Sequence, residues 1–255
     1  MNPLLVATPR SSAASSGPAK QRGSASDALA LTPPPADQQR HKILLLDDHP
    51  MTRYGMARLI EQEPDLVVCG EAESARAALE AVQTHKPDVV LVDLTMPGGE
   101  GLEFIKDMKA LHPEIAVLVV SMHEEDVYAQ RALRAGSRGY IMKSAGGEQL
   151  VKAIRQVLEG KIYLSDNMSG KILEVFSGQR QPGETSTLDK LSDREFEVFR
   201  LLGQGLTTRE ISQRLHLGTK TVDTHRLHLR QKLGFKTGAA LIKYAIQWAG
   251  SQQMI

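Results

Sequence analysis

The chain has 255 residues, enough for two ordinary domains, and a formal net charge of +1. Its single cysteine, Cys69, excludes a disulfide framework and favours a reducing compartment, so we expect a cytoplasmic protein. The longest strictly apolar run, residues 115–120, is far shorter than the roughly 20 residues that cross a bilayer, and we expect no contact with a membrane.

The charge is distributed unevenly along the chain. Residues 1–40 carry a net charge of +2, residues 41–163 carry −5 and residues 164–255 carry +4. Within residues 207–243, eight Lys and Arg residues stand against two acidic residues. Such a local basic excess is typical of a segment that binds phosphate backbones.

Residues 1–40 are rich in Ser, Ala, Pro, Gly and Gln and contain no aromatic residue, which predicts a disordered tail. Residues 41–163 alternate short apolar runs with helical patterns. The predicted strands are 42–46, 66–71, 88–92, 115–120 and 138–142, and the predicted helices are 52–62, 74–84, 100–111, 125–135 and 147–159. This pattern predicts an α/β doubly wound, five-stranded parallel sheet with helices on both faces.

Polar side chains follow four of the five predicted strands. Asp47 and Asp48 follow the first strand, Asp93 the third, Ser121 the fourth and Lys143 the fifth. Any one of them could simply mark the end of a strand at the solvent boundary. Because the carboxyl ends of parallel strands form the ligand-binding edge of such sheets, the whole set indicates one functional site.

Three clustered carboxylates repel one another and need a cation. Oxygen ligands on an open edge suit Mg²⁺. An aspartate beside that metal can act as a nucleophile and form an aspartyl-phosphate. A nearby Lys143 would neutralise the phosphoryl oxygens, and the Ser121 hydroxyl could donate to one of them.

The stretches "LLLDDHP", "VDLTMPGGEGLE" and "VVSMHEEDVYAQRALRAGSRGYIMKSA" resemble the receiver domain of two-component response regulators, over residues 42 to about 163. The resemblance implies that Asp93 is the phosphoacceptor. It also implies that Mg²⁺ is held directly by Asp48, through water by Asp47, by the backbone carbonyl of Thr95 and by Asp93. Lys143 would pair with the phosphoryl group, and Ser121 and Tyr140 would form the switch pair that responds to it.

Other phosphate chemistries fit these residues less well. A phosphatase of the haloacid dehalogenase type needs a second Asp two residues after its nucleophile, where this chain has Thr95. The stretch "MPGGEG" lacks the Gly-Lys-Ser/Thr ending of a nucleotide-binding loop, so we expect a turn. His49 and His85 have no metal-ligand partners at useful spacing, and we expect ordinary exposed histidines.

Residues 164–187 are predicted to be a linker with a short helix over 166–176, and residues 188–255 a small all-α domain. "SDRE" (192–195) and "TTRE" (207–210) are capping boxes that start helices. A third helix is predicted from Thr219 to Gly234 and a fourth from Gly238 to Trp248. The predicted interior is Leu201, Leu202, Ile211, Leu215, Val222, Leu229 and Leu233.

A short bundle with a basic middle is a candidate helix-turn-helix. Residues 191–237 resemble the LuxR-type helix-turn-helix, with "EIS", "TV" and "KLG" at the positions where that family has them. A receiver domain followed by a LuxR-type module resembles the NarL/FixJ class of response regulators. A quorum-sensing receptor shares the second module, but the receiver motifs exclude its lactone-binding domain.

Helical geometry at 100° per residue predicts which side of the third helix faces DNA. Val222, His225 and Leu229 share the inner face, so His225 is expected to pack rather than to contact a base. Lys220 is expected to contact a phosphate or a guanine, and Thr224 a base edge or methyl group. Asp223 is expected either to accept a hydrogen bond from a cytosine or to discourage wrong sites. Leu227 stands where relatives often have a polar residue. The predicted DNA contacts are Arg209, Lys220, Thr221, Asp223, Thr224, Leu227, Gln231 and Lys236.

The sequence therefore predicts a non-enzymatic transcription regulator switched by aspartyl phosphorylation. Its expected partners are a histidine kinase, Mg²⁺, double-stranded promoter DNA and a second copy of the chain on paired half-sites. Two alternatives stay open, a phosphatase or phosphotransferase that uses Asp93 as nucleophile and an atypical DNA-binding regulator that is not phosphorylated.

Overall fold

A computed structural model of the protein describes residues 40–122, 125–170 and 187–251. The predicted tail, except its last residue, and most of the predicted linker lie outside the described residues. Within the linker, residues 166–170 are helical, and the rest of the helix predicted over 166–176 is outside the described part. The proposed domain boundaries at residues 41, 164 and 188 stay predictions.

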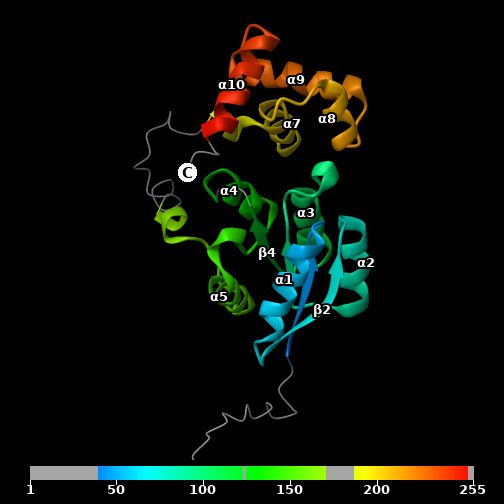
Figure 1. Ribbon diagram of the computed structural model, residues 1–255, viewed down its shortest axis with the longest axis vertical. Coiled ribbons are helices and arrows are strands. Elements are labelled where there is room, and N and C mark those ends of the chain that lie inside the picture. The colour runs from blue at the N-terminus through cyan, green and yellow to red at the C-terminus, as the bar shows by residue number, and fades with distance from the viewer. Residues whose placement is uncertain (1–39, 123–124, 171–186, 252–255) are drawn as a thin grey trace, which may run out of the picture. The chain divides into compact units, whose positions relative to one another are not determined.

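The first domain is built on five parallel strands in the order β2-β1-β3-β4-β5 (Figure 1). The strands are β1 His41–Leu46, β2 Leu66–Ala72, β3 Val89–Val92, β4 Ala116–Ser121 and β5 Gly139–Met142. The strand order reverses between β1 and β3, which lie side by side at the centre of the sheet. Ligands bind beyond the carboxyl ends of the strands at such a reversal point.

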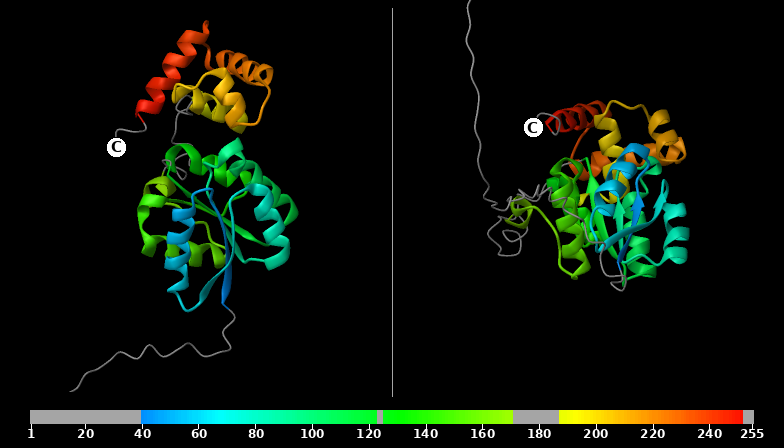
Figure 2. Two further views of the ribbon diagram at one scale, coloured as in Figure 1. Left: turned by 45° about the vertical axis from the view of Figure 1, so that its right-hand side comes forward. Right: turned by 60° about the horizontal axis from the view of Figure 1, so that its bottom comes forward.

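Helices cover both faces of this sheet, as Figure 2 shows. They are α1 Pro50–Glu61, α2 Ala75–His85, α3 Gly101–Leu111, α4 Glu125–Ala135 and α5 Gly147–Leu158. Alternate residues of each central strand enter different cores: Ile43 and Leu45 pack with α1 and α5, whereas Leu44 and Leu46 pack with α2 and α3. A strand that is apolar at every position is therefore required here, as the sequence predicted.

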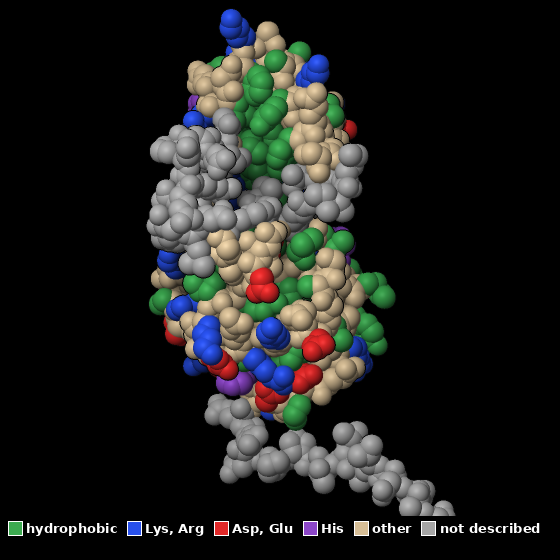
Figure 3. All heavy atoms as spheres, turned by 90° about the vertical axis from the view of Figure 1, so that its left-hand side faces the viewer, with side chains coloured by type: hydrophobic (Ala, Val, Ile, Leu, Met, Phe, Trp, Pro, Cys, Tyr) green, Lys and Arg blue, Asp and Glu red, His purple; other side chains and the backbone are tan. Residues whose placement is uncertain are grey.

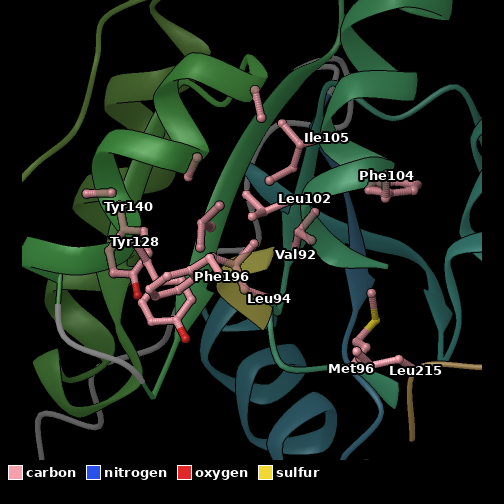
Figure 4. Close-up of a cluster of buried hydrophobic side chains, with 14 of the residues drawn as sticks. Val92, Leu94, Met96, Leu102, Phe104, Ile105, Tyr128, Tyr140, Phe196 and Leu215 are labelled. Carbon is pink, nitrogen blue, oxygen red and sulfur yellow. The ribbon is translucent and has the colours of Figure 1, made fainter. Parts of the chain in front are cut away.

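The packing of β3 against α3 fixes the chain that follows the strand. Val92 and Leu94 point towards Leu102 and Ile105 of α3 (Figure 4), and all four side chains are buried. Gly101 begins α3 so close to β3 that an added Cβ would lie 2.8 Å from the Cα of Leu94. The segment between β3 and α3 is therefore held tightly at both ends.

The second domain contains four α-helices in its described residues, preceded by a 3₁₀ turn at Thr187–Lys190. These are α7 Asp193–Gly203, α8 Thr208–Arg214, α9 Thr219–Leu233 and α10 Gly238–Ser251. Both predicted capping boxes are present, at Ser192 and at Thr207. Every predicted α-helix and strand of the two domains is found, with ends within three residues of the prediction where both are described.

The core of the second domain forms between α7, α9 and α10. The Phe199 ring of α7 lies 5.3 Å from the Trp248 ring and 5.8 Å from the Tyr244 ring of α10. Gly203 lets the two helices meet, because an added Cβ would lie 2.6 Å from the Ala245 carbonyl oxygen. Six of the seven predicted interior residues are buried and Leu233 is partly buried. No helix among the described residues has the length and apolar character to span a bilayer.

Candidate phosphorylation and DNA-binding sites

The ends of β1 and β3 bring two aspartates together. Leu46 and Val92 are paired in register, so Asp47 and Asp93 leave adjacent strands at the same edge. The Asp93 amide donates to the Leu46 carbonyl at 2.8 Å, which extends the pairing to the base of the site. Asp47 is fully buried and Asp93 is 2% exposed. Two carboxylates buried side by side require a compensating cation.

Lys143, which follows β5, supplies part of that compensation. Its Nζ lies 2.6 Å from Asp47 Oδ2 and 2.8 Å from Asp93 Oδ2. Burial alone would lower the pKa of Lys143, but its hydrogen bonds to Asp47 and Asp93 raise that pKa overall. The ammonium group is therefore held charged between the two acids, where it can also meet a group attached to Asp93.

A third carboxylate, that of Asp48, is left with a buried oxygen atom. Ligand atoms of Asp47, Asp48, His49 and Asp93 all lie within 4.8 Å of one another. Asp48 Oδ1 is buried, and a close polar neighbour among the described residues is the His49 imidazole, 2.8 Å away. A buried carboxylate oxygen in an oxygen-rich cluster fits a hard divalent cation such as Mg²⁺.

His49 is exposed as expected, but it does not stand apart from the site. Its Nδ1 atom lies 2.8 Å from Asp48 Oδ1 and 3.3 Å from Asp47 Oδ1, positions that form ion pairs only when the imidazole is protonated. The prediction that His49 has no metal-ligand partners at useful spacing is wrong, because Asp47, Asp48 and Asp93 offer ligand atoms close to it. The backbone amide of His49 also donates to Asp47 Oδ1 at 2.8 Å, so the turn after β1 folds onto its own carboxylate.

Thr95 fixes the orientation of the Asp93 carboxylate. Its backbone amide and its hydroxyl both donate to Asp93 Oδ1, at 2.9 and 2.6 Å. The chain then turns through Gly98 and Gly99, whose φ angles of 84° and 66° favour glycine. The predicted turn in "MPGGEG" is confirmed, since the segment forms a 3₁₀ turn at Pro97–Gly99 before α3.

The predicted switch pair is brought together on β4 and β5. Ser121 and Tyr140 are fully buried, and their side chains share a hydrogen bond. Burial raises the pKa of the Tyr140 hydroxyl, and the Ser121 hydrogen bond opposes this shift, so the phenol stays protonated at neutral pH. Ser121 lies at the end of β4, the strand next to β3, and Tyr140 lies on β5, one strand further from Asp93.

Arg53 is a site residue that the sequence did not indicate. Its Nη1 donates to the Asp47 carbonyl at 2.6 Å, and its Nε pairs with Glu71 at 3.1 Å. Arg53 thus ties the first turn of α1 to the ends of β1 and β2. Nothing in the spacing of these residues predicts the contact, because it depends on how α1 packs on the sheet.

In the second domain, α8 and α9 form the helix-turn-helix pair. All eight predicted DNA contacts are exposed: Arg209, Lys220, Thr221, Asp223, Thr224, Leu227, Gln231 and Lys236. Val222 and Leu229 are buried, and His225 is half-buried with its Nδ1 atom enclosed. Desolvation lowers the pKa of His225, which suits a neutral, packed imidazole. The contacts themselves stay predictions.

The fold and the acidic site define a receiver domain, and the tight helical pair defines a helix-turn-helix domain. The family described as "Response regulator receiver domain" matches residues 43–155, and that described as "Bacterial regulatory proteins, luxR family" matches residues 189–245. The chain belongs to the response regulators of the NarL/FixJ class and is a DNA-binding transcription regulator.

Relatives extend this similarity over most of the chain. The oxygen regulatory protein NreC of Staphylococcus haemolyticus (strain JCSC1435) is 33% identical over 210 residues, which cover 81% of this chain and 97% of that protein. The structure of RcsB from Salmonella enterica serovar Typhimurium, bound to promoter rprA with phosphomimetic BeF3−, is 26% identical. The match covers 81% of this chain and 98% of the RcsB chain, with a TM-score of 0.59. A structure of two RcsB dimers bound to two parallel DNAs is also 26% identical, with a TM-score of 0.57, and covers 81% and 99%.

Proposed function

We propose that Asp93 accepts a phosphoryl group from a histidine kinase and that this modification controls promoter binding by α8 and α9. The observation that carries the proposal is the arrangement around Asp93: Lys143 bonds to its Oδ2, Thr95 to its Oδ1, and the Asp48 carboxylate lies close by. This is a carboxylate oriented for attack and surrounded by groups that bind phosphate and a divalent cation.

In the proposed reaction, a bond forms between the Asp93 carboxylate and phosphorus while the bond from phosphorus to the donor breaks. Asp47, Asp48, Asp93 and the Thr95 carbonyl would hold Mg²⁺, which supplies positive charge to the phosphoryl oxygens. Lys143 would move its ion pair from Asp47 and Asp93 to the new phosphoryl group, and the Ser121 hydroxyl would donate to it. Because Ser121 shares a hydrogen bond with Tyr140, that donation would change the bonding of Tyr140.

The DNA-binding half of the proposal rests on α9. Its exposed side chains include Lys220 and Gln231, and the 207–243 segment carries the basic excess. In such a motif the second helix enters the major groove and reads base edges. Arg209 and Lys236 lie outside α9, where phosphate contacts would fix its register.

We propose that the protein binds paired half-sites as a homodimer. Figure 3 shows hydrophobic side chains gathered on the second domain where α10 reaches the surface. Ile246 of α10 is 48% exposed, and Ile242 and Trp248 are partly buried nearby on the same helix. An exposed apolar helix face of this kind suits a second copy. The RcsB dimers bound to DNA give a precedent in a relative.

Incubation with a small phosphodonor and Mg²⁺, followed by intact mass spectrometry, tests the phosphorylation site. We expect one phosphoryl adduct on the wild type and none on Asp93→Ala, with Asp88→Asn, at the opposite end of β3, as a matched control that still forms it. An adduct that survives in Asp93→Ala would overturn the assignment. Steady release of phosphate from a small ester, without affinity for DNA, would favour the enzyme alternative instead.

A further inference from the structure

Leu227 is an exposed apolar side chain on the helix that is proposed to read DNA. It is 44% exposed, whereas Val222 and Leu229 provide the buried contacts of α9. Leu227 therefore adds little to the core of the second domain. A single exposed leucine needs no explanation on an ordinary surface. Here its neighbours on α9 make its position informative.

Thr224 lies one turn before Leu227 on the same face of α9. Its hydroxyl donates to the Lys220 carbonyl at 3.0 Å, a bond within the helix. With its hydrogen engaged in this way, the hydroxyl can only accept, and the methyl group is the apolar part that Thr224 offers an approaching molecule. Thr224 and Leu227 together therefore form a short apolar stripe, with Lys220 before it and Gln231 after it.

The polar side chains beside this stripe are held by contacts within the domain. The Arg226 guanidinium donates to the Thr208 hydroxyl at the start of α8. The same hydroxyl lies 3.4 Å from Asp223 Oδ1, and Asp223 lies 3.9 Å from Arg226. These three side chains fix α9 against α8. Arg226 is thereby less available to read a base, whereas the Asp223 side chain is 65% exposed and makes only the longer contacts.

The C5-methyl of thymine is the apolar group on the base edges of the major groove, and apolar side chains recognise it by contact. We propose that Leu227 and the Thr224 methyl group recognise thymine methyls, so that each half-site requires thymine beneath the middle of α9. The inference rests on the proposed DNA-binding function and specifies what its reading helix selects.

Replacing thymine by deoxyuridine removes only the methyl group and leaves the hydrogen-bonding edge intact. The full-length protein is first used to select bound sites from random DNA, and each thymine of the selected half-site is then replaced singly by deoxyuridine. We expect binding roughly fourfold weaker at one or two adjacent positions, as the loss of one buried methyl group predicts. Positions outside the footprint of α9 serve as controls.

Leu227→Ala identifies the side chain responsible. We expect this variant to bind thymine and deoxyuridine sites equally at the sensitive position, while Leu227→Met, which keeps the apolar contact, still prefers thymine. Melting curves should be unchanged, because Leu227 is exposed. If deoxyuridine has no effect at any position, or weakens Leu227→Ala as much as the wild type, the inference is wrong while DNA binding stands. If the wild-type protein selects no DNA, the proposed function fails as well.

Discussion

At the scale of single residues, the site depends on charge compensation between the ends of three strands. Asp47 and Asp93 are buried with their carboxylates turned to the same ammonium group of Lys143. Leaving a buried charge without its partner costs more than the pair contributes in isolation. A divalent cation at the neighbouring Asp48 would share this role, so the lysine and the metal should partly replace one another.

Lys143→Met should therefore destabilise the protein most strongly when no divalent cation is present. We expect a loss of about 3 kcal/mol in the free energy of unfolding with a chelator present, because two buried carboxylates lose their counter-charge. Mg²⁺ should restore more stability to this variant than to the wild type, since it binds the folded site. Urea unfolding followed by circular dichroism measures both effects.

Lys152→Met removes an exposed lysine from α5 and provides the matched control. It should leave both the stability and the response to Mg²⁺ close to those of the wild type. The compensation account would be contradicted by equal responses to Mg²⁺ in Lys143→Met and in the wild type.

At the scale of elements, the order and bounds of the helices and strands could be predicted from the sequence. The signals were the alternation of short apolar runs with helical patterns, the polar residues at strand ends and the two capping boxes. They could not predict contacts that form only when elements pack. Three contacts are of this kind: the short distance between His49 and Asp48, the hydrogen bond from Arg53 to the Asp47 carbonyl, and the hydrogen bond from Arg226 to the Thr208 hydroxyl. Lys86 and His216 adopt positive φ angles of 49° and 53°, in positions where no glycine marks the turn.

Glu195 belongs to the capping box of α7 and also forms an ion pair with α9. Its carboxylate accepts from the Ser192 amide at 2.8 Å and from Lys232 of α9 at 2.6 Å. Burial alone would raise the pKa of Glu195, but the hydrogen bonds from Lys232 and Ser192 hold it below its ordinary value. A carboxyl whose pKa is lowered by folding stabilises the fold above its unfolded pKa, and this contribution is lost in acid.

Glu195→Gln should accordingly cost about 2 kcal/mol of unfolding free energy at neutral pH, because hydrogen bonds to a charged group are lost. The difference from the wild type should shrink as the pH falls through and below the ordinary pKa of glutamate, where the wild-type carboxyl is also protonated. Unfolding at a series of pH values measures this. Glu210→Gln alters the exposed box at Thr207 and should cost less; a pH-independent difference for Glu195→Gln would refute the charge-based explanation.

At the scale of the whole molecule, the receiver and helix-turn-helix domains carry opposite net charge and separate chemistries. One holds the carboxylate that we propose is phosphorylated, and the other holds the basic helix pair that we propose reads DNA. Phosphorylation can regulate DNA binding only if it changes the free energy difference between states that bind DNA unequally. The coupling between Asp93 and α9 is therefore the central claim.

The affinity of the full-length protein for its selected paired half-sites, measured with and without phosphodonor and Mg²⁺, tests that claim most directly. We expect the wild-type affinity to change by at least about fivefold, within the usual range of coupling between two sites. No change is expected in Asp93→Ala at the same salt concentration. An affinity that is unaffected in the wild type, or that changes equally in Asp93→Ala, would contradict the account.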